Sequence, residues 1–270
     1  MSFNVLYSII VGVVQGISEW LPISSKTQVL LVSNALFALP LVVAYAFGLF
    51  MEIGSVGSAL IYFRKDIVSL IRNRKLLVYL VVVTTVTAII GVPVYLLVER
   101  ILEGAYNVGI PMLILGVILI SNGFYIRRSR ASQMIGSLEE MKMKHYLAVG
   151  IAQGIAAFPG VSRSGMTTST MLLMGVRPDV AFRLSFLAYI PAAIGAFLMT
   201  ILISKKEVHA AIANIDSTGI LIAIVSSAII GLIVISFLLK LAKDSRIYMV
   251  NFVLGSIALV IGTITTIGIH

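Results

Sequence analysis

The chain has 270 residues, of which 59% are hydrophobic and 11% are charged, which excludes a water-soluble globular protein and indicates a polytopic membrane protein. The formal net charge of +9 lies mostly in short loops between apolar runs. This pattern is typical of the positive-inside bias and of attraction to anionic lipids, rather than of nucleic-acid binding. The absence of cysteine excludes disulfide bonds, thiolate metal sites and cysteine nucleophiles.

A polar motif near the N-terminus returns about half a chain later. VGVVQGISEW at Val11–Trp20 aligns without a gap with VGIAQGIAAF at Val149–Phe158, and both copies run through a proline into a serine cluster. This spacing indicates an internal duplication, with chance similarity in a chain rich in glycine, valine and isoleucine as the alternative. Glu19 belongs to the first copy and Arg163 follows the second, so we expect one site where the two halves meet.

Each copy interrupts an apolar segment with polar residues. Phe3–Val14 is apolar but short, polar residues around Pro22 follow it, and apolar sequence resumes at Val29. A lipid-exposed span cannot carry these polar groups at membrane depth, whereas a re-entrant hairpin that lines a protein cavity can. We therefore expect one re-entrant helical hairpin ending near Leu39 and another ending near Gly175. No basic segment precedes the first apolar run, so no cleaved signal peptide is expected.

Six further apolar runs are long enough to cross a bilayer. They are Leu41–Phe63, Leu76–Val98, Gly104–Ile126, Leu184–Ser204, Ser217–Leu239 and Ile247–Ile269. Basic loops are expected on the cytoplasmic side, and acidic or neutral loops on the outer side together with both termini. The basic loops are 64–75, 127–145 and 240–246, and the outer ones are the tight acidic turn 99–103 and the loop 205–216.

An odd number of spans separates the two motifs, so the two repeats should have opposite orientations. The sequence therefore predicts an all-α polytopic membrane protein with six transmembrane helices and two re-entrant helical hairpins, arranged as two inverted-topology repeats. The chain should form a single membrane domain over 1–270, with repeat 1 at about 1–130 and repeat 2 at about 145–270. Inverted repeats of this kind place a binding site near the bilayer midplane.

Two carboxylates lie within apolar sequence. Glu19 follows Gln15 by one helical turn, so the two side chains face the same way. An ionisable group at membrane depth is costly and is a functional-site candidate by default. For Glu19 the alternative is capping of a helix end at the Leu-Pro break. For Glu52 two interpretations stay open, a second site carboxylate and a structural partner of a buried cation.

The segment PGVSRSGMT at Pro159–Thr167 is the most specific in the chain. Small residues let the backbone approach a ligand, N–H groups at a loop-to-helix entry can form an anion nest, and a guanidinium fork suits phosphate oxygens. The phosphate-binding candidates in this segment are Gly160, Ser162, Arg163, Ser164 and Thr167. The alternative is small-residue helix packing in which Arg163 pairs with Glu19 or Glu52.

The first copy continues into LPISSKT, whose hydroxyls follow a proline break and can point into a cavity. Ser24, Ser25 and Lys26 are candidates there for a nucleophile or for further phosphate contacts. The histidines of the chain, His145, His209 and His270, fall in predicted loops or at the C-terminus. This placement argues against a histidine metal cluster and against a Ser-His-Asp triad.

Together these residues resemble the undecaprenyl-diphosphate phosphatase family, also called the bacitracin-resistance protein family, over essentially the full chain. The resemblance is carried by Gln15-xxx-Glu19, EWLPISS at Glu19–Ser25, Glu52–Ser55, Pro159–Thr167 and LSFLAYIPA at Leu184–Ala192. It implies an integral-membrane enzyme that removes the terminal phosphate of a polyprenyl diphosphate carrier outside the cytoplasm. The carrier is then recycled for the synthesis of envelope polymers such as peptidoglycan.

The resemblance also implies roles and partners. Glu19 corresponds to an essential carboxylate, Ser25 to the nucleophile or a key hydroxyl, and Arg163 to a phosphate clamp. A divalent metal ion, Mg²⁺ or Ca²⁺, is implied as cofactor, with Glu19, Gln15 and Glu52 as candidate ligands. The expected partners are a polyprenyl diphosphate and membrane lipids in the plasma membrane, and not nucleic acid. The oligomeric state is left open between monomer and homodimer, and the active site should open to the extracytoplasmic side.

The chain departs from the family pattern after the serines. The family usually has a glycine-histidine pair where this chain has Thr27 and Gln28, and Lys26 stands where a small residue is usual. Glutamine forms hydrogen bonds but does not relay a proton near neutral pH, so Gln28 is expected to contact phosphate only. Arg183 takes the place of a glutamate before LSFL, which changes the charge at that position.

Two functions from different classes follow. In the first, a hydrolase, Arg163 and the backbone nest neutralise the diphosphate while Ser25 or water attacks the terminal phosphorus. In the second, a polyprenyl-phosphate transporter or flippase uses the same midplane anion site, which needs no histidine. The sequence favours the hydrolase, and phosphate release set beside lipid translocation in liposomes would separate the two.

Overall fold

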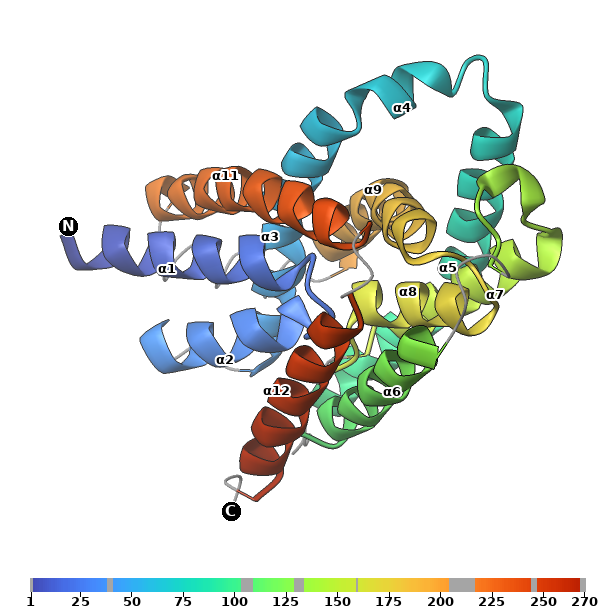
Figure 1. The fold of residues 1–270 in the computed structure, drawn as a ribbon. Helices are drawn as coiled ribbons and strands as arrows, with labels where there is room; N and C mark the ends of the chain where they lie inside the picture. The colour runs from blue at the N-terminus through green and yellow to red at the C-terminus, as the bar shows by residue number, and fades with distance from the viewer. Residues whose placement is uncertain are drawn as a thin grey trace.

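The computed structural model describes residues 2–37, 41–102, 109–128, 134–158, 160–203, 217–243 and 247–267. Most of these residues are helical, and the strand-like pairing found among them is an isolated bridge between Ile135 and Val176. The α-helices are α1 (Ser2–Ser18), α2 (Ser25–Phe37), α3 (Leu41–Tyr62), α4 (Arg64–Ser69), α5 (Arg74–Leu102), α6 (Gly109–Arg128), α7 (Met143–Ile155), α8 (Arg163–Leu173), α9 (Pro178–Ile203), α11 (Ser217–Leu241) and α12 (Ile247–Ile267) (Figure 1). A short 3₁₀ helix, η2 (Leu138–Glu140), precedes α7.

The outer faces of the long helices are apolar. Within the described residues, four segments are long and apolar enough to cross a membrane: Arg74–Leu97, Pro178–Leu202, Ser217–Leu241 and Tyr248–Ile267. Along α11 an apolar side chain points outward once per turn, and these side chains are between 48% and 62% exposed. They are Leu221, Val225, Ile229, Ile233 and Phe237. Contact of such a long apolar stripe with lipid is favourable, whereas its contact with water is unfavourable. The chain is therefore a membrane protein.

These four segments coincide with four of the predicted spans. The other two predictions, Leu41–Phe63 and Gly104–Ile126, fall on α3 and α6, both of which are helical where they are described. Residues 104–108 lie outside the described ranges. That α3 and α6 cross the membrane stays a prediction.

Two predicted loops are partly helical. The acidic turn expected at 99–103 is wrong in part, because α5 continues through Glu99 and Arg100 to Leu102. Glutamate and arginine are good helix formers, so charge at the end of an apolar run does not end the helix. The basic loop predicted at 64–75 contains α4 and the first turn of α5.

His145 was expected in a loop and instead lies buried in the first turn of α7. Its Nδ1 accepts a hydrogen bond from the backbone N–H of Lys142 at 2.8 Å. The imidazole therefore caps a helix start, where backbone donors lack intrahelical partners. His209 and His270 lie outside the described residues.

Helix–break–helix pairs occupy the positions of both predicted hairpins. Glu19–Ser24 separates α1 from α2, and residues 156–162 separate α7 from α8, with Pro159 outside the described residues. In each pair the second helix packs back on the first. The polar motifs therefore form the breaks themselves.

Each pair also packs on a long helix from the other half of the chain. α1 lies along α11, and α7 lies along α5 (Figure 1). Glycines permit this close approach: a Cβ added at Gly16 would lie 2.7 Å from the backbone oxygen of Ser227, and one added at Gly154 would lie 2.7 Å from Cβ of Ile90. Gly16 and Gly154 are equivalent positions in the two motif copies, so both copies use the same packing device.

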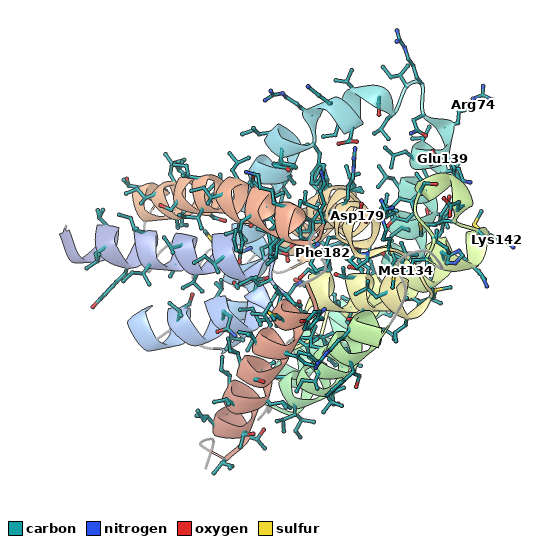
Figure 2. The ribbon with its side chains drawn as sticks, in the orientation of Figure 1. Arg74, Met134, Glu139, Lys142, Asp179 and Phe182 are labelled. Atoms are coloured by element: carbon teal, nitrogen blue, oxygen red, sulfur yellow. The ribbon has the colours of Figure 1, made fainter. Side chains whose placement is uncertain are left out.

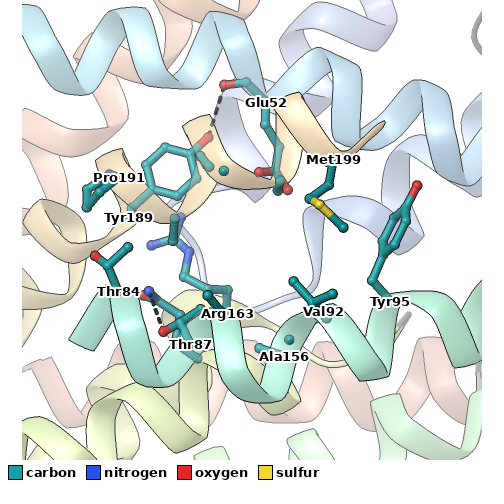
Figure 3. A pocket seen from close by; sticks show the side chains of 18 of the residues that line it. Glu52, Thr84, Thr87, Val92, Tyr95, Ala156, Arg163, Tyr189, Pro191 and Met199 are labelled. Atoms are coloured by element: carbon teal, nitrogen blue, oxygen red, sulfur yellow. Dashed lines mark hydrogen bonds between the residues drawn. The ribbon is translucent and has the colours of Figure 1, made fainter. Parts of the chain in front are cut away.

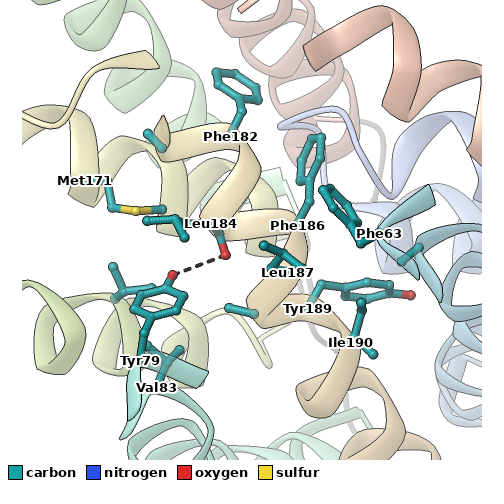
Figure 4. Packing of buried hydrophobic residues seen from close by; sticks show 14 of the residues in the cluster. Phe63, Tyr79, Val83, Met171, Phe182, Leu184, Phe186, Leu187, Tyr189 and Ile190 are labelled. Carbon is teal, nitrogen blue, oxygen red and sulfur yellow. Dashed lines mark hydrogen bonds between the residues drawn. The ribbon is translucent and has the colours of Figure 1, made fainter. Parts of the chain in front are cut away.

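α9 lies in the middle of the helices and carries much of the core. In the most apolar 18-residue stretch of α9, 50% of the residues are buried, whereas in the corresponding stretch of α5 only 11% are buried. Aromatic residues of α9 pack against α3, α5 and α8 (Figure 4). Tyr79 of α5 donates a hydrogen bond from its hydroxyl to the backbone oxygen of Leu184 at 3.2 Å. This core fixes α9 beside the two breaks.

Charged side chains gather at one end of the molecule. Arg74 at the start of α5, Glu139 of η2 and Lys142 before α7 lie together there (Figure 2). A cavity of about 570 Å³ at this end is lined by residues that include Asn73, Glu139 and Lys243. The three basic loops predicted to share one side of the membrane thus contribute to one face of the fold.

We expect Gly16→Ala to lower the free energy of unfolding by about 1–3 kcal/mol, because the added methyl group meets the backbone of α11, which cannot move aside alone. Gly195→Ala in α9 is the matched control, since no heavy atom lies within 4 Å of a Cβ added there. Thermal unfolding of both variants in detergent measures the difference. Equal stability of the two would contradict the packing of α1 on α11.

Candidate active site

The two breaks bring two helix starts together. Ser25 is the first residue of α2, and Arg163 is the first residue of α8. Ser24, just before α2, has φ of 40°, and Gly160, shortly before α8, has φ of 86°. A left-handed conformation is costly for serine and free for glycine, and such strain is characteristic of functional turns. Both turns end with a candidate site residue at a helix N-terminus, where backbone N–H groups favour an anion.

Glu19 is the centre of the site. Its Oε1 accepts a hydrogen bond from Nη2 of Arg163 at 2.6 Å. Its Oε2 accepts from Oγ of Ser25 at 2.7 Å and from Nε2 of Gln15 at 2.8 Å. Glu19 is only 3% exposed, so this cation and these donors replace its hydration. Because a carboxylate that accepts from a hydroxyl can take its proton, the geometry suits a base beside a nucleophile.

A line of hydrogen bonds continues from Glu19 into the helix packing. Nε2 of Gln15 also donates to Oγ of Ser55 at 3.3 Å, and Ser55 and Ser227 share a hydrogen bond of 3.2 Å between their hydroxyls. This line connects the carboxylate to α3 and α11. Oε1 of Gln15 is buried and has no hydrogen-bond partner among the described residues, so it can accept from or coordinate a ligand beside Glu19.

Arg163 is held by aromatic rings. The central carbon of its guanidinium lies 3.9 Å from the centroid of the Tyr189 ring and 5.8 Å from that of Trp20. Trp20 in turn packs edge-on against Tyr189, with their ring centroids 5.1 Å apart. Nη1 of Arg163 is buried without a hydrogen-bond partner in the part of the chain that the structure describes. The rings and Glu19 therefore fix the plane of the fork, while one nitrogen stays available for a ligand oxygen.

Lys26 and Glu52 form a second buried ion pair. Nζ of Lys26 lies 3.1 Å from Oε1 of Glu52, and the two side chains are 11% and 4% exposed. Tyr189 joins this pair to the first, since its hydroxyl donates to the backbone oxygen of Glu52 at 3.1 Å (Figure 3). Glu52 thus pairs with a buried cation, as one of the two open interpretations had it. Across the two ion pairs, the formal charges of the carboxylates and cations cancel.

Hydroxyl groups join the two breaks to each other. Oγ1 of Thr27 accepts from the backbone N–H of Gly160 at 2.7 Å, and Oγ of Ser164 donates to the backbone oxygen of Leu21 at 2.9 Å. Thr27 also shares a hydrogen bond of 2.9 Å with the hydroxyl of Ser24. The bonds of Gly160 to Thr27 and of Ser164 to Leu21 run between opposite halves, so they hold the site together without help from a ligand.

The hydroxyls of Ser162 and Thr167, two other predicted phosphate ligands, are also engaged within the protein. Oγ of Ser162 accepts from the backbone N–H of Gly165 at 3.1 Å and so caps α8. Thr167 and Ser185 share a hydrogen bond of 2.6 Å between their hydroxyls. Gln28 is half-buried and is not among the residues that line the cavity described next. The phosphate contacts assigned to these residues stay predictions.

A cavity of about 390 Å³ lies beside the two ion pairs (Figure 3). Lys26, Glu52 and Arg163 form part of its wall, and most of the remaining lining is apolar and comes from α5 and α9, including Val92 and Met199. A cavity with a charged wall and apolar flanks suits an amphipathic ligand that has an anionic head and an apolar tail.

The predicted metal ligands fit a divalent ion only in part. Among the described residues, no three His, Asp or Glu side chains lie close enough together to hold a metal ion. Gln15, Glu19 and Glu52 supply the hard oxygen atoms that Mg²⁺ and Ca²⁺ prefer, and the unpartnered Oε1 of Gln15 fits such a role. Both carboxylates are already paired with cations of the protein. A divalent ion at these residues would therefore take its remaining ligand atoms from a bound anionic ligand.

Sequence reasoning gave no role to three residues of the site, Tyr189, Thr27 and Gln153. Gln153 is the motif counterpart of Gln15, lines the cavity and donates from Nε2 to Oγ1 of Thr87 at 3.2 Å. The alignment of the two copies contained the signal for Gln153. Tyr189 lies within the LSFLAYIPA run that carries the family resemblance, and Thr27 is a departure from the family pattern. Neither signal gives the residue a role, because their partners come from distant segments.

Comparisons with known proteins show which family the sequence resembles over its length. The sequence pattern of the family described as bacitracin resistance protein BacA matches residues 8–262. The chain is 55% identical to an undecaprenyl-diphosphatase of Sulfurisphaera tokodaii, with 97% of this chain and 98% of that one covered. It is 51% identical to one of Saccharolobus islandicus, with 96% and 97% covered, and 39% identical to one of Pyrobaculum islandicum, with 97% of both covered.

We expect Thr27→Val to lower the free energy of unfolding by about 1–3 kcal/mol, because the near-isosteric change leaves the buried N–H of Gly160 without its acceptor. Thr263→Val on the exposed face of α12 is the control, since its hydroxyl bonds only to a backbone oxygen of its own helix. Thermal unfolding in detergent measures both variants. A Thr27 variant as stable as the control would show that this contact does not hold the two breaks together.

Proposed function

The chain belongs to the bacitracin resistance protein BacA family, and from that membership we propose that it is an integral-membrane hydrolase of polyprenyl diphosphates. It removes the terminal phosphate of an undecaprenyl-type carrier and returns the monophosphate for reuse in envelope synthesis. The similar proteins named above carry the name undecaprenyl-diphosphatase. The observation that carries the proposal is the hydrogen bond of 2.7 Å from Ser25 to Glu19, whose other oxygen is bound by Arg163, a residue that lines the cavity.

The anionic head of the substrate binds at the polar wall of the cavity. Nη1 of Arg163 has no partner among the described residues and binds a phosphate oxygen, while its bond to Glu19 fixes the fork. Lys26 lines the same wall and adds a mobile positive charge. The N-termini of α2 and α8 favour the same charge through their backbone N–H groups, and Gly160, Ser162, Ser164 and Thr167 complete this environment. The prenyl chain follows the apolar lining supplied by α5 and α9.

Ser25 is the proposed nucleophile. Its oxygen attacks the terminal phosphorus as its proton passes to Glu19, and the bond from that phosphorus to the bridging oxygen breaks. The polyprenyl monophosphate leaves with the bridging oxygen, which takes the proton back from Glu19. Water then attacks the phosphoserine, Glu19 takes the proton from water and passes it to the serine oxygen, and inorganic phosphate is released. Arg163 stabilises the charge that spreads over the phosphoryl oxygens in both steps.

Residues for a divalent cation are also proposed. Glu19, Glu52 and Oε1 of Gln15 would hold Mg²⁺ or Ca²⁺ together with phosphate oxygens of the substrate, which is how Mg²⁺ usually binds in phosphate chemistry. When bound, such an ion would neutralise phosphate charge and polarise the phosphoryl group.

The membrane arrangement belongs to the same proposal. Six transmembrane helices and two re-entrant hairpins form two inverted repeats, with both termini outside and the site open to the extracytoplasmic side. In each half of the chain, the first helix of the hairpin packs on a long helix of the other half, α1 on α11 and α7 on α5. A pseudo-two-fold axis between the repeats would generate this pair of contacts, which therefore supports the arrangement. The gathering of the basic loops on one face supports a common cytoplasmic side.

Arg163→Lys should lower phosphate release at least about tenfold, because a planar fork fixed by Glu19 and Tyr189 becomes a mobile point charge. Arg183→Lys is the matched control, since Arg183 lies on the exposed surface paired with Asp66. Phosphate release from undecaprenyl diphosphate in detergent measures both variants. Full turnover by the Arg163 variant would remove Arg163 from the reaction.

Ser25→Ala should lower phosphate release by at least about a hundredfold, because a nucleophile activated by its base is lost. Ser33→Ala on the same helix is the control, since Ser33 is buried and its hydroxyl has no hydrogen-bond partner among the described residues. Acid-quenched wild type should retain labelled phosphate on Ser25. Turnover by Ser25→Ala near the wild-type rate would assign the attack to water, whereas lipid translocation in liposomes without phosphate release would contradict the hydrolase.

A further inference from the structure

Both carboxylates that could hold a divalent cation are already neutralised by side chains of the protein. Oε1 of Glu19 lies 2.6 Å from Nη2 of Arg163, and Oε1 of Glu52 lies 3.1 Å from Nζ of Lys26. All four side chains are nearly removed from water. A divalent ion that joined this set would leave the buried site with excess positive charge, which is strongly unfavourable in a medium of low polarity.

The two cations are not equally free to leave their partners. Arg163 is fixed by Glu19, by the ring of Tyr189 and by Trp20. Lys26 is a long, flexible side chain, and its ion pair within the described residues is with Glu52. It follows Ser25 directly at the start of α2 and lines the cavity together with Glu52. Lys26 is therefore the cation that an incoming anion can draw away.

We propose that Lys26 is a counter-ion switch, which keeps Glu52 from binding a divalent cation until a diphosphate enters the cavity. An anionic head draws the ammonium from Glu52 to its phosphate oxygens, and the freed carboxylate then requires a new cation. The divalent ion and the diphosphate therefore bind cooperatively, and each raises the affinity of the other by the same factor. The inference rests on the proposed function for the identity of the anion and for the residues that hold the divalent cation.

The unpartnered oxygen of Gln15 supports a cation in the filled site. Oε1 of Gln15 is completely buried, and Nε2 of the same amide donates to Glu19. The orientation of the amide is thus set by its donor, and its acceptor remains beside the carboxylate. A cation provides the partner that the described protein groups do not supply.

The test measures binding of Mn²⁺ by electron paramagnetic resonance on the purified full chain in detergent, without any anion. Lys26→Gln should bind Mn²⁺ at least about tenfold more tightly than wild type, because Glu52 is freed while the amide can still donate to it. Lys26→Arg keeps the positive charge and should bind as weakly as wild type. Lys65→Gln is the control for the loss of an exposed positive charge and should change nothing.

A second measurement uses Glu52→Gln, so that the proposal does not depend on the folding of the Lys26 variant. With free Mn²⁺ held constant by a metal buffer, a non-hydrolysable geranylgeranyl methylenediphosphonate should raise Mn²⁺ occupancy in wild type and not in Glu52→Gln. The double variant Lys26→Gln/Glu52→Gln should not show the increase in Mn²⁺ affinity that Lys26→Gln alone produces.

Mn²⁺ affinity of Lys26→Gln equal to that of wild type would overturn the switch. The switch would also be overturned if the increase in Mn²⁺ affinity persisted in the double variant, or if the diphosphonate still raised Mn²⁺ occupancy in Glu52→Gln. The proposed function fails separately, through absent phosphate release by wild type. In that case a gain in Lys26→Gln would still establish the competition between lysine and metal.

Discussion

A carboxylate and a guanidinium from opposite halves of the chain lie 2.6 Å apart, and both are nearly removed from water. An unpaired charge at such a buried position strongly destabilises the fold, since removal of one partner from a buried ion pair costs about 3–5 kcal/mol of stability. The pair therefore requires both breaks to be formed and docked before either helix start is stable. The hydroxyl contacts between the breaks and the contact of Arg163 with Trp20 depend on this docking.

The same constraint explains why small residues surround the site. Glycines at equivalent positions of the two motif copies bring α1 onto α11 and α7 onto α5, and these contacts place the breaks side by side. α9 supplies the aromatic wall that orients Arg163, and it is fixed by the core on its other faces. The catalytic groups of the proposed hydrolase thus lie on helix ends whose positions are set by packing, and this pre-organisation is what a phosphoryl-transfer site requires.

Much of this site could be predicted because local signals point to it. The duplicated motif identified Glu19 and Arg163 as opposite members of one centre, and the proline and serine breaks lie directly before α2 and α8, although α2 begins at Ser25 rather than at the predicted Val29. The pairing of Lys26 with Glu52 and the stacking of Tyr189 on Arg163 could not be predicted, because each joins segments that no sequence period relates. Similarly, α5 extends through its charged end, in keeping with the helix propensity of Glu99 and Arg100.

A double-mutant cycle on Glu19 and Arg163 tests most directly whether this ion pair unites the two halves. The free energy of unfolding in mixed micelles is measured for wild type, Glu19→Gln, Arg163→Met and the double variant. Each single change should leave one buried charge unpaired, and the double variant should be much more stable than the sum of the two losses allows, with a coupling of about 2 kcal/mol or more. Additive losses would show that the two residues do not depend on each other, and would contradict a site assembled by this pair.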